Sequence, residues 1–225
     1  METSLSFVHR FEPGTQPGAR PLLLLHGTGG NEDDLVPFAE MIAPGSPMLS
    51  PRGKVIESGK SRFFRRLAEG VFDEADVHRR ALELAQFIEE AGKNYGIAPP
   101  LALGYSNGAN IAAAVLLLRP SVLSGALLLR AMVPFARPPE AKLEGTAVLI
   151  LSGARDPIIP AANASRLASI LKAAGALVDH RTLGVGHELS PMDVKIARGW
   201  LESLAVAGDD ELARTARRAG HRDNR

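Results

Sequence analysis

A serine between two glycines is the first group in this chain with an evident chemical use. Ser106 lies in the run Gly-Tyr-Ser-Asn-Gly, residues 104–108, directly after an apolar segment typical of a buried strand. In a nucleophile elbow the serine occupies a sharp turn from a strand into a helix, and its neighbours must be small for the turn to close. The apolar segment 111–118 predicts that helix. We therefore expect Ser106 to be a catalytic nucleophile, the alternative being an ordinary glycine-rich turn.

A serine nucleophile needs a base, and in elbow hydrolases the histidine follows both the serine and the acid along the chain. The histidines after Ser106 are His180, His187 and His221. His180 falls within a strand pattern, and His221 lies in a charged C-terminal segment. His187 lies in a glycine-rich loop before the last predicted helix. We expect His187 to be the base.

The acid of such a site comes from a loop at the carboxyl end of a strand. Asp156 follows the apolar segment 147–151 in an Asp-Pro loop, which makes it the candidate that orients His187. Its alternative role is to cap a turn or the following helix. Asp179 is the second candidate for the acid, although it lies within a strand pattern.

Acyl transfer also requires N–H donors for the oxyanion. We expect one from the backbone of Asn107, the residue after the nucleophile, and one from Thr28 in the His-Gly-Thr-Gly-Gly loop after residues 21–25. These glycines match neither the phosphate-loop pattern nor the dinucleotide-binding pattern. The sequence around His187 lacks a zinc motif, so we expect no metal there.

Strand and helix patterns alternate along the chain, which predicts an α/β fold with a mostly parallel sheet covered on both faces. A helix is expected after a cap at Asp76, ending near Gly92, and another over residues 161–174. A last helix is expected from Pro191, behind Ser190. The expected strands number about seven: residues 5–11, 21–25, 48–50, 101–103, 125–129, 147–151 and 176–181.

Composition indicates one domain. The chain has 225 residues, of which 45% are hydrophobic, and no cysteine. We assign residues 1–206 to a single catalytic domain and residues 207–225 to a charged, flexible tail with about one turn of helix. Lys and Arg number 26 against 25 Asp and Glu, so no nucleic-acid partner is expected. Without a leader pattern or a membrane-spanning apolar run, the expected location is the cytoplasm.

Four features occur in the order His-Gly loop, serine elbow, Asp-Pro loop and Gly-His. In this the chain resembles the α/β-hydrolase superfamily, without a large lid domain, and within it the phospholipase/carboxylesterase family, which includes acyl-protein thioesterases. The bacterial carboxylesterase branch is the nearest in pattern. The resemblance covers about residues 7–204. It implies hydrolysis of a small-molecule carboxylic ester or thioester by a Ser-His-Asp triad, without cofactor or membrane insertion, often in a homodimer.

Two other functions remain open on the sequence alone. One is a cofactor-free perhydrolase or haloperoxidase with the same triad, and the other is a non-enzymatic ligand-binding protein on a hydrolase scaffold. The substrate pocket is also undecided. Residues 51–76 show little regular pattern and contain Arg62, Phe63 and Phe64. These three side chains are candidates for the pocket wall, the alternative being buried phenylalanines and solvated arginines.

Overall fold

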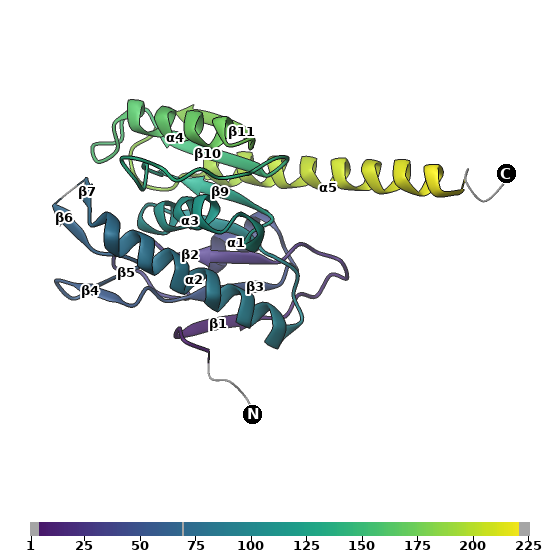
Figure 1. Ribbon diagram of the computed structural model, residues 1–225, viewed down its shortest axis with the longest axis horizontal. Coiled ribbons are helices and arrows are strands. Elements are labelled where there is room, and N and C mark those ends of the chain that lie inside the picture. The colour runs from purple at the N-terminus through teal and green to yellow at the C-terminus, as the bar shows by residue number, and fades with distance from the viewer. Residues whose placement is uncertain (1–4, 69, 221–225) are drawn as a thin grey trace.

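The computed structural model describes residues 5–68 and 70–220. Its centre is a seven-stranded sheet in the order β1-β3-β2-β8-β9-β10-β11 (Figure 1). Only β1 is antiparallel to its neighbour. The predicted α/β fold and sheet are confirmed. The strands are β1 His9–Glu12, β2 Leu22–Leu25, β3 Met48–Pro51, β8 Leu101–Tyr105, β9 Gly125–Leu129, β10 Ala147–Gly153 and β11 Leu177–Leu183.

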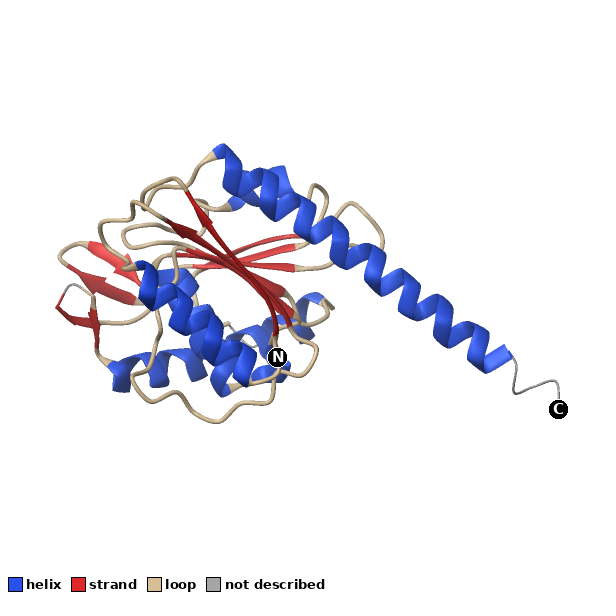
Figure 2. Ribbon diagram, turned by 90° about the horizontal axis from the view of Figure 1, so that it is seen from above, coloured by secondary structure: helices blue, strands red, loops and turns tan. Residues whose placement is uncertain are grey.

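The central strands are apolar because both of their faces are covered. In β2, Leu23 and Leu25 pack into one cluster and Leu22 and Leu24 into the other. One face is covered by α2, α3 and α4, and the other by α1 and α5 (Figure 2). A short 3-10 helix, η1 Pro120–Val122, precedes β9. The helices are α1 Val36–Ile42, α2 Glu74–Tyr95, α3 Asn107–Leu118, α4 Ala161–Ala173 and α5 Pro191–Gly220.

The start of α2 corrects the predicted cap. Asp73 is the N-cap, and its side chain accepts a hydrogen bond from the Asp76 N–H at 3.1 Å. Asp76 instead lies in the first turn, where its buried carboxylate accepts from the Arg65 N–H at 2.8 Å. The helix ends at Tyr95, beyond Gly92, and Gly96 takes the left-handed conformation that stops it.

Residues 51–76 form regular structure that their sequence did not indicate. They contain two small hairpins, β4 Val55–Glu57 with β5 Lys60–Arg62, and β6 Arg66–Ala68 with β7 Val71–Phe72. The first hairpin touches the loop after β2, because the Gly29 N–H donates to the Ser61 carbonyl at 2.8 Å. The insertion thus lies beside the carboxyl ends of the parallel strands.

Helix α5 continues to Gly220 and projects from the body of the molecule (Figure 2). The sequence predicted only about one turn of helix after residue 206. Residues 221–225 of the expected tail lie outside the described residues, so the domain boundary at 206 and the flexibility of the tail stay predictions. Among the described residues, no helix is long and apolar enough to cross a membrane.

Candidate active site

Ser106 occupies a strained turn between β8 and α3. Its φ is 52° and its ψ is −112°, a backbone conformation that residues other than glycine rarely adopt. The turn is held on both sides, since the Ser106 N–H donates to the Leu129 carbonyl at 2.8 Å and the Ser106 carbonyl accepts from the Asn110 N–H at 3.0 Å. This is the backbone geometry expected of a nucleophile elbow.

The glycines around Ser106 are required by close backbone contacts. A Cβ at Gly104 would lie 2.6 Å from the Gly108 carbonyl oxygen. A Cβ at Gly108 would lie 1.9 Å from the carbonyl oxygen of Leu25, at the end of β2. The elbow can therefore close only with hydrogen atoms at both positions, which explains the spacing of the motif.

Ser106, His187 and Asp156 lie together in one hydrogen-bonded chain. The Ser106 Oγ lies 2.9 Å from His187 Nε2, and His187 Nδ1 lies 2.8 Å from Asp156 Oδ2. The other oxygen of Asp156 accepts from the Ile158 and Ile159 N–H groups at 2.8 and 3.0 Å. Asp156 thus makes the contacts expected of both interpretations of the sequence, to His187 and to the backbone of the Asp-Pro turn. Asp179 pairs with Arg181 on β11 instead.

Arg130, which the sequence analysis did not consider, holds the His187 loop. It follows β9 with a φ of 55°. Its Nε donates to the Gly186 carbonyl at 3.0 Å and its Nη2 to the Glu188 carbonyl at 2.9 Å. The guanidinium thereby binds the carbonyls on both sides of His187. The sequence feature that could have identified Arg130 is its position as a single arginine directly after a buried strand, at the edge of the sheet where the site forms.

The Arg130 side chain is fully buried and paired with Asp193. The two guanidinium nitrogens lie 2.8 and 2.9 Å from the two carboxylate oxygens, and both side chains are 0% exposed. Asp193 also accepts from the Ser190 N–H at 2.8 Å, at the start of α5. The Tyr105 hydroxyl donates to the His187 carbonyl at 3.2 Å, and burial raises its pKa. Three successive carbonyls, residues 186–188, therefore accept from buried or half-buried side chains.

The two proposed oxyanion donors lie in neighbouring loops. Leu25 of β2 is paired with Gly104 of β8, so the loops that follow these strands are adjacent. Thr28 and Asn107 both line the hollow that contains Ser106. Within residues 5–68 and 70–220, neither backbone N–H donates to a protein acceptor, which leaves both available to a ligand.

His26 ties this loop to the insertion and was not a sequence candidate. Its Nε2 accepts from the Gly53 N–H at 3.0 Å, and its Nδ1 lies 2.6 Å from the Gly27 carbonyl. Because Gly53 can only donate, Nε2 carries no proton and Nδ1–H is the donor. Burial lowers the pKa of His26, which favours this neutral form.

A hollow of about 310 Å³ lies over Ser106 and His187. Arg62 lines it, as do several apolar side chains. Phe63 and Phe64 are not in its wall, because they are 3% and 0% exposed and belong to the core. The prediction that Phe63 and Phe64 line the pocket wall is therefore wrong. The Phe63 N–H instead donates to Asn107 Oδ1 at 2.7 Å, which fastens the insertion to α3.

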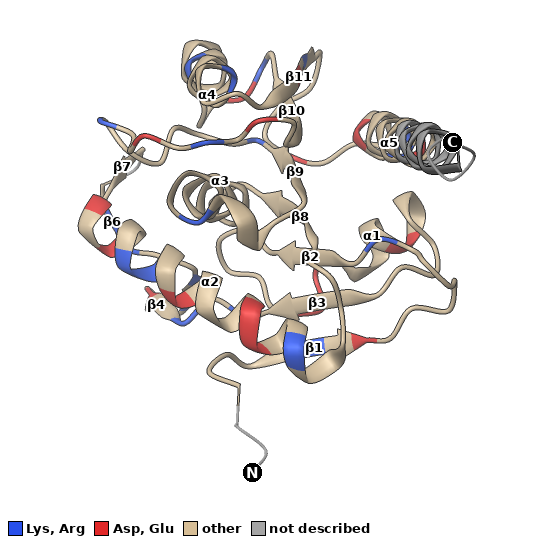
Figure 3. Cartoon of the chain, turned by 45° about the vertical axis from the view of Figure 1, so that its right-hand side comes forward, with Lys and Arg blue, Asp and Glu red and all other residues tan. Residues whose placement is uncertain are grey.

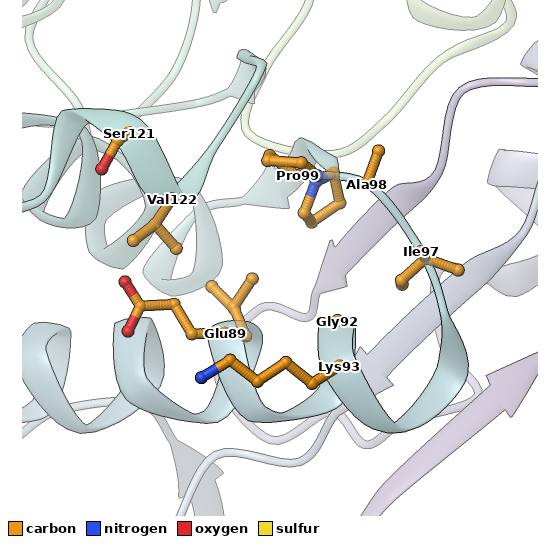
Figure 4. A pocket seen from close by; sticks show the side chains of 10 residues that line it. Glu89, Gly92, Lys93, Ile97, Ala98, Pro99, Ser121 and Val122 are labelled. Atoms are coloured by element: carbon orange, nitrogen blue, oxygen red, sulfur yellow. The ribbon is translucent and has the colours of Figure 1, made fainter.

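A larger hollow, about 560 Å³, lies at the opposite edge of the sheet (Figure 4). It is bounded by Lys93 of α2, by Pro99 before β8 and by Val122 of η1. Its lining includes neither a histidine nor Ser106. The predicted nucleophile and base line the smaller hollow instead.

Comparison with known proteins agrees with this fold. No family model matches the chain. A Bacillus subtilis protein named "Putative hydrolase MhqD" is 40% identical over 200 residues, 88% of this chain and 99% of that protein. A Bacillus cereus carboxylesterase structure is 44% identical with a TM-score of 0.86, over 88% of this chain and 94% of that one. A Mesorhizobium loti carboxylesterase is 34% identical with a TM-score of 0.84, over 89% and 96% of the two chains.

The mostly parallel sheet and these structural neighbours define an α/β-hydrolase. Within that class, the chain belongs to the carboxylesterase family. It is a hydrolase enzyme, as the sequence predicted, and its relatives support ester hydrolysis as its general activity.

Proposed function

We propose that this enzyme cleaves small-molecule carboxylic esters through an acyl-enzyme on Ser106. The observation that carries the proposal is the continuous chain from Ser106 Oγ through His187 to Asp156, with distances of 2.9 and 2.8 Å. Thioesters fit the same chemistry. The homodimer implied by the resemblance and the cytoplasmic location expected from the sequence patterns stay predictions.

In the first half-reaction, Ser106 Oγ attacks the ester carbonyl carbon while His187 Nε2 accepts the hydroxyl proton. The N–H groups of Thr28 and Asn107 stabilise the resulting oxyanion. The carbon–oxygen bond to the alcohol then breaks, and His187 returns its proton to the leaving oxygen. Asp156 holds the imidazole in the required tautomer and stabilises its charged form.

In the second half-reaction, water attacks the acyl group and gives a proton to His187. The bond between the acyl carbon and Ser106 Oγ breaks, the serine regains its proton, and the carboxylic acid leaves. No redox step or external cofactor is needed to balance this sequence.

Covalent labelling tests the assignment of the nucleophile. An activated serine reacts with a fluorophosphonate, so intact-protein mass spectrometry should show one adduct, which peptide mapping places on Ser106. Ser106→Ala should abolish it, whereas Ser121→Ala, at an exposed serine of η1, should not. A folded protein that is unlabelled, or labelled at another serine, would overturn the proposal.

A further inference from the structure

The hollow over Ser106 has a cationic wall. Lys60 and Arg62 of β5 and Arg66 of β6 line it, and among residues 5–68 and 70–220 no aspartate or glutamate lines it. All three basic residues come from the insertion between β3 and α2. The wall is therefore built by a segment outside the central sheet, next to the proposed nucleophile.

These positive charges are only partly neutralised. Glu57 Oε1 lies 2.6 Å from Arg66 Nε, and Glu57 Oε2 lies 3.4 Å from Arg62 Nε, so one carboxylate serves two guanidinium groups. Lys60 forms no ion pair with any residue in the described part of the chain. The group of four side chains thus carries an excess of two positive charges.

This excess is local. Along α2, for example, acidic and basic segments alternate (Figure 3). The whole chain has a formal net charge of only +1. An anion would therefore be attracted to the hollow by nearby side chains rather than by the field of the molecule, and the attraction should be sensitive to salt.

Two of the basic side chains lie beside the oxyanion loop. Arg62 is 4% exposed and its Nη1 donates to Thr28 Oγ1 at 2.7 Å. Lys60 lies against Gly29, whose Cβ position would be 3.6 Å from the lysine Cγ. The apolar residues of the hollow are Phe72, Met132, Ile158 and Ile159.

Of Lys60 and Arg62, only the Arg62 side chain is held by hydrogen bonds to the described residues. Its guanidinium also donates to the Phe64 carbonyl at 3.2 Å, and burial lowers its pKa. Lys60 is exposed, and the Arg66 side chain is 38% exposed, so both can reach a bound ligand.

We propose that the preferred esters carry a carboxylate, which Lys60 and Arg66 bind beside the scissile bond. This inference rests on the proposed function. The apolar side chains then contact the uncharged remainder of the substrate. The carboxylate can belong to the acyl part or to the alcohol part, and the two cases need different probes.

Two matched pairs of esters separate these cases. For the acyl part, monomethyl succinate is compared with methyl pentanoate by methanol release. For the alcohol part, 4-acetoxybenzoate is compared with 4-acetoxybenzamide by release of the phenol. In each pair the measured quantity is the ratio of kcat/KM for the charged ester to that for the neutral ester, in wild-type enzyme and variants.

The wild-type ratio should favour the charged ester in at least one pair and should fall as salt is raised. Lys60→Gln and Arg66→Gln should each lower that ratio by about tenfold, the usual scale for one charged hydrogen bond. Arg181→Gln, which removes an exposed arginine on β11, should leave the ratio unchanged. Because both values of kcat/KM are measured on the same enzyme sample, their ratio does not depend on the fraction of the variant that is folded.

A ratio near one in both pairs would overturn the inference, as would a preference that neither variant nor salt reduces. In those cases hydrolysis of the neutral esters and labelling of Ser106 would leave the proposed function intact. If no ester is hydrolysed and Ser106 is not labelled, the proposed function fails and this inference fails with it.

Discussion

Asp156 divides its two oxygens between two tasks. Oδ1 accepts two backbone N–H groups of the Asp-Pro turn, while Oδ2 lies 2.8 Å from His187 Nδ1. The sequence alone left capping of the turn and orientation of His187 as alternative roles for Asp156. Here the turn fixes the side chain so that the second oxygen points at the histidine.

Asp156→Asn should separate these tasks. The amide oxygen can still accept from the Ile158 and Ile159 N–H groups, so Tm should change little. The amide NH2 faces His187 Nδ1 and selects the wrong imidazole tautomer, so kcat should fall by about three to four orders of magnitude with KM nearly unchanged. Steady-state kinetics and thermal unfolding measure the two effects. Asp156→Ala, the control, should also lower Tm. A lower Tm with unchanged kcat in Asp156→Asn would assign a capping role alone.

His26 gives a second prediction, on stability against pH. Burial lowers its folded-state pKa below the ordinary value of about 6.5. Below about pH 6.5 the unfolded chain therefore binds more protons than the folded one, and stability falls as pH falls. Urea unfolding at pH 7.5 and pH 5.5 should show a larger loss for wild type than for His26→Gln. Equal losses would contradict this, and the comparison cancels other titrating groups such as His180.

Sequence reasoning was strongest for residues whose position depends on local backbone. The position of Ser106 in an elbow was predictable because the close backbone contacts of that turn require glycine at positions 104 and 108. Arg130 was not, because its role depends on contacts with residues 56 to 63 positions later in the chain. Such long-range partners leave no pattern in the local sequence.

At the scale of elements, Arg130 joins the end of β9 to the His187 loop and to the start of α5. A fully buried ion pair is expensive to desolvate, and removing one partner leaves the other charge unpaired. The pair is therefore sensitive to conservative changes. Its hydrogen bonds to the carbonyls of Gly186 and Glu188 make the position of His187 depend on it.

Arg130→Lys should expose this dependence. Lysine keeps the charge facing Asp193 but cannot donate to Asp193 and to both loop carbonyls in the same planar arrangement. We expect a lower Tm, and, well below that Tm, a kcat reduced by about ten- to a hundredfold with little change in KM. The rate of fluorophosphonate labelling should fall in parallel. A folded variant with wild-type kcat and labelling rate would show that the contacts serve stability alone.

Other elements were predictable to different degrees. The central buried strands were found because each is a continuous apolar run. The half-buried edge strand β1 begins four residues later than expected. The hairpins of residues 51–76 have strands of only two or three residues, too short to show alternation. Helix α1 has seven residues and was missed for the same reason. At α2 the N-cap is Asp73, three residues before the predicted Asp76, and the sequence analysis did not consider it.

For the whole molecule, the sheet brings the parts of the site together from distant parts of the chain. The loops after β2, β8 and β10 supply Thr28, Ser106 and Asp156, and the loop after β11 supplies His187. Because these strands are parallel neighbours, their carboxyl ends meet at one edge of the sheet. The alternation of strands and helices was enough to predict this convergence, but not the insertion that shapes the hollow.

The projection of α5 raises the question of which part of it the enzyme needs. Residues of α5 before position 207 pack against the sheet, with Ala197 and Trp200 buried in the core and Ile196 and Leu204 beside them. These residues supply the apolar burial that holds the helix in place. The start of the helix also carries Asp193, the partner of Arg130.

Deleting residues 207–225 should therefore leave Tm and kcat/KM within error of the full-length values. The physical reason is that the apolar contacts of Ala197, Trp200, Ile196 and Leu204 and the Asp193 ion pair remain in the shortened chain. Thermal unfolding, ester hydrolysis and light scattering after size-exclusion chromatography measure the three relevant properties. A shorter deletion, of residues 221–225 only, provides the control. If the full-length protein is a dimer that separates on removal of 207–225, this segment of α5 is an assembly element rather than a dispensable tail, and the boundary at 206 is wrong.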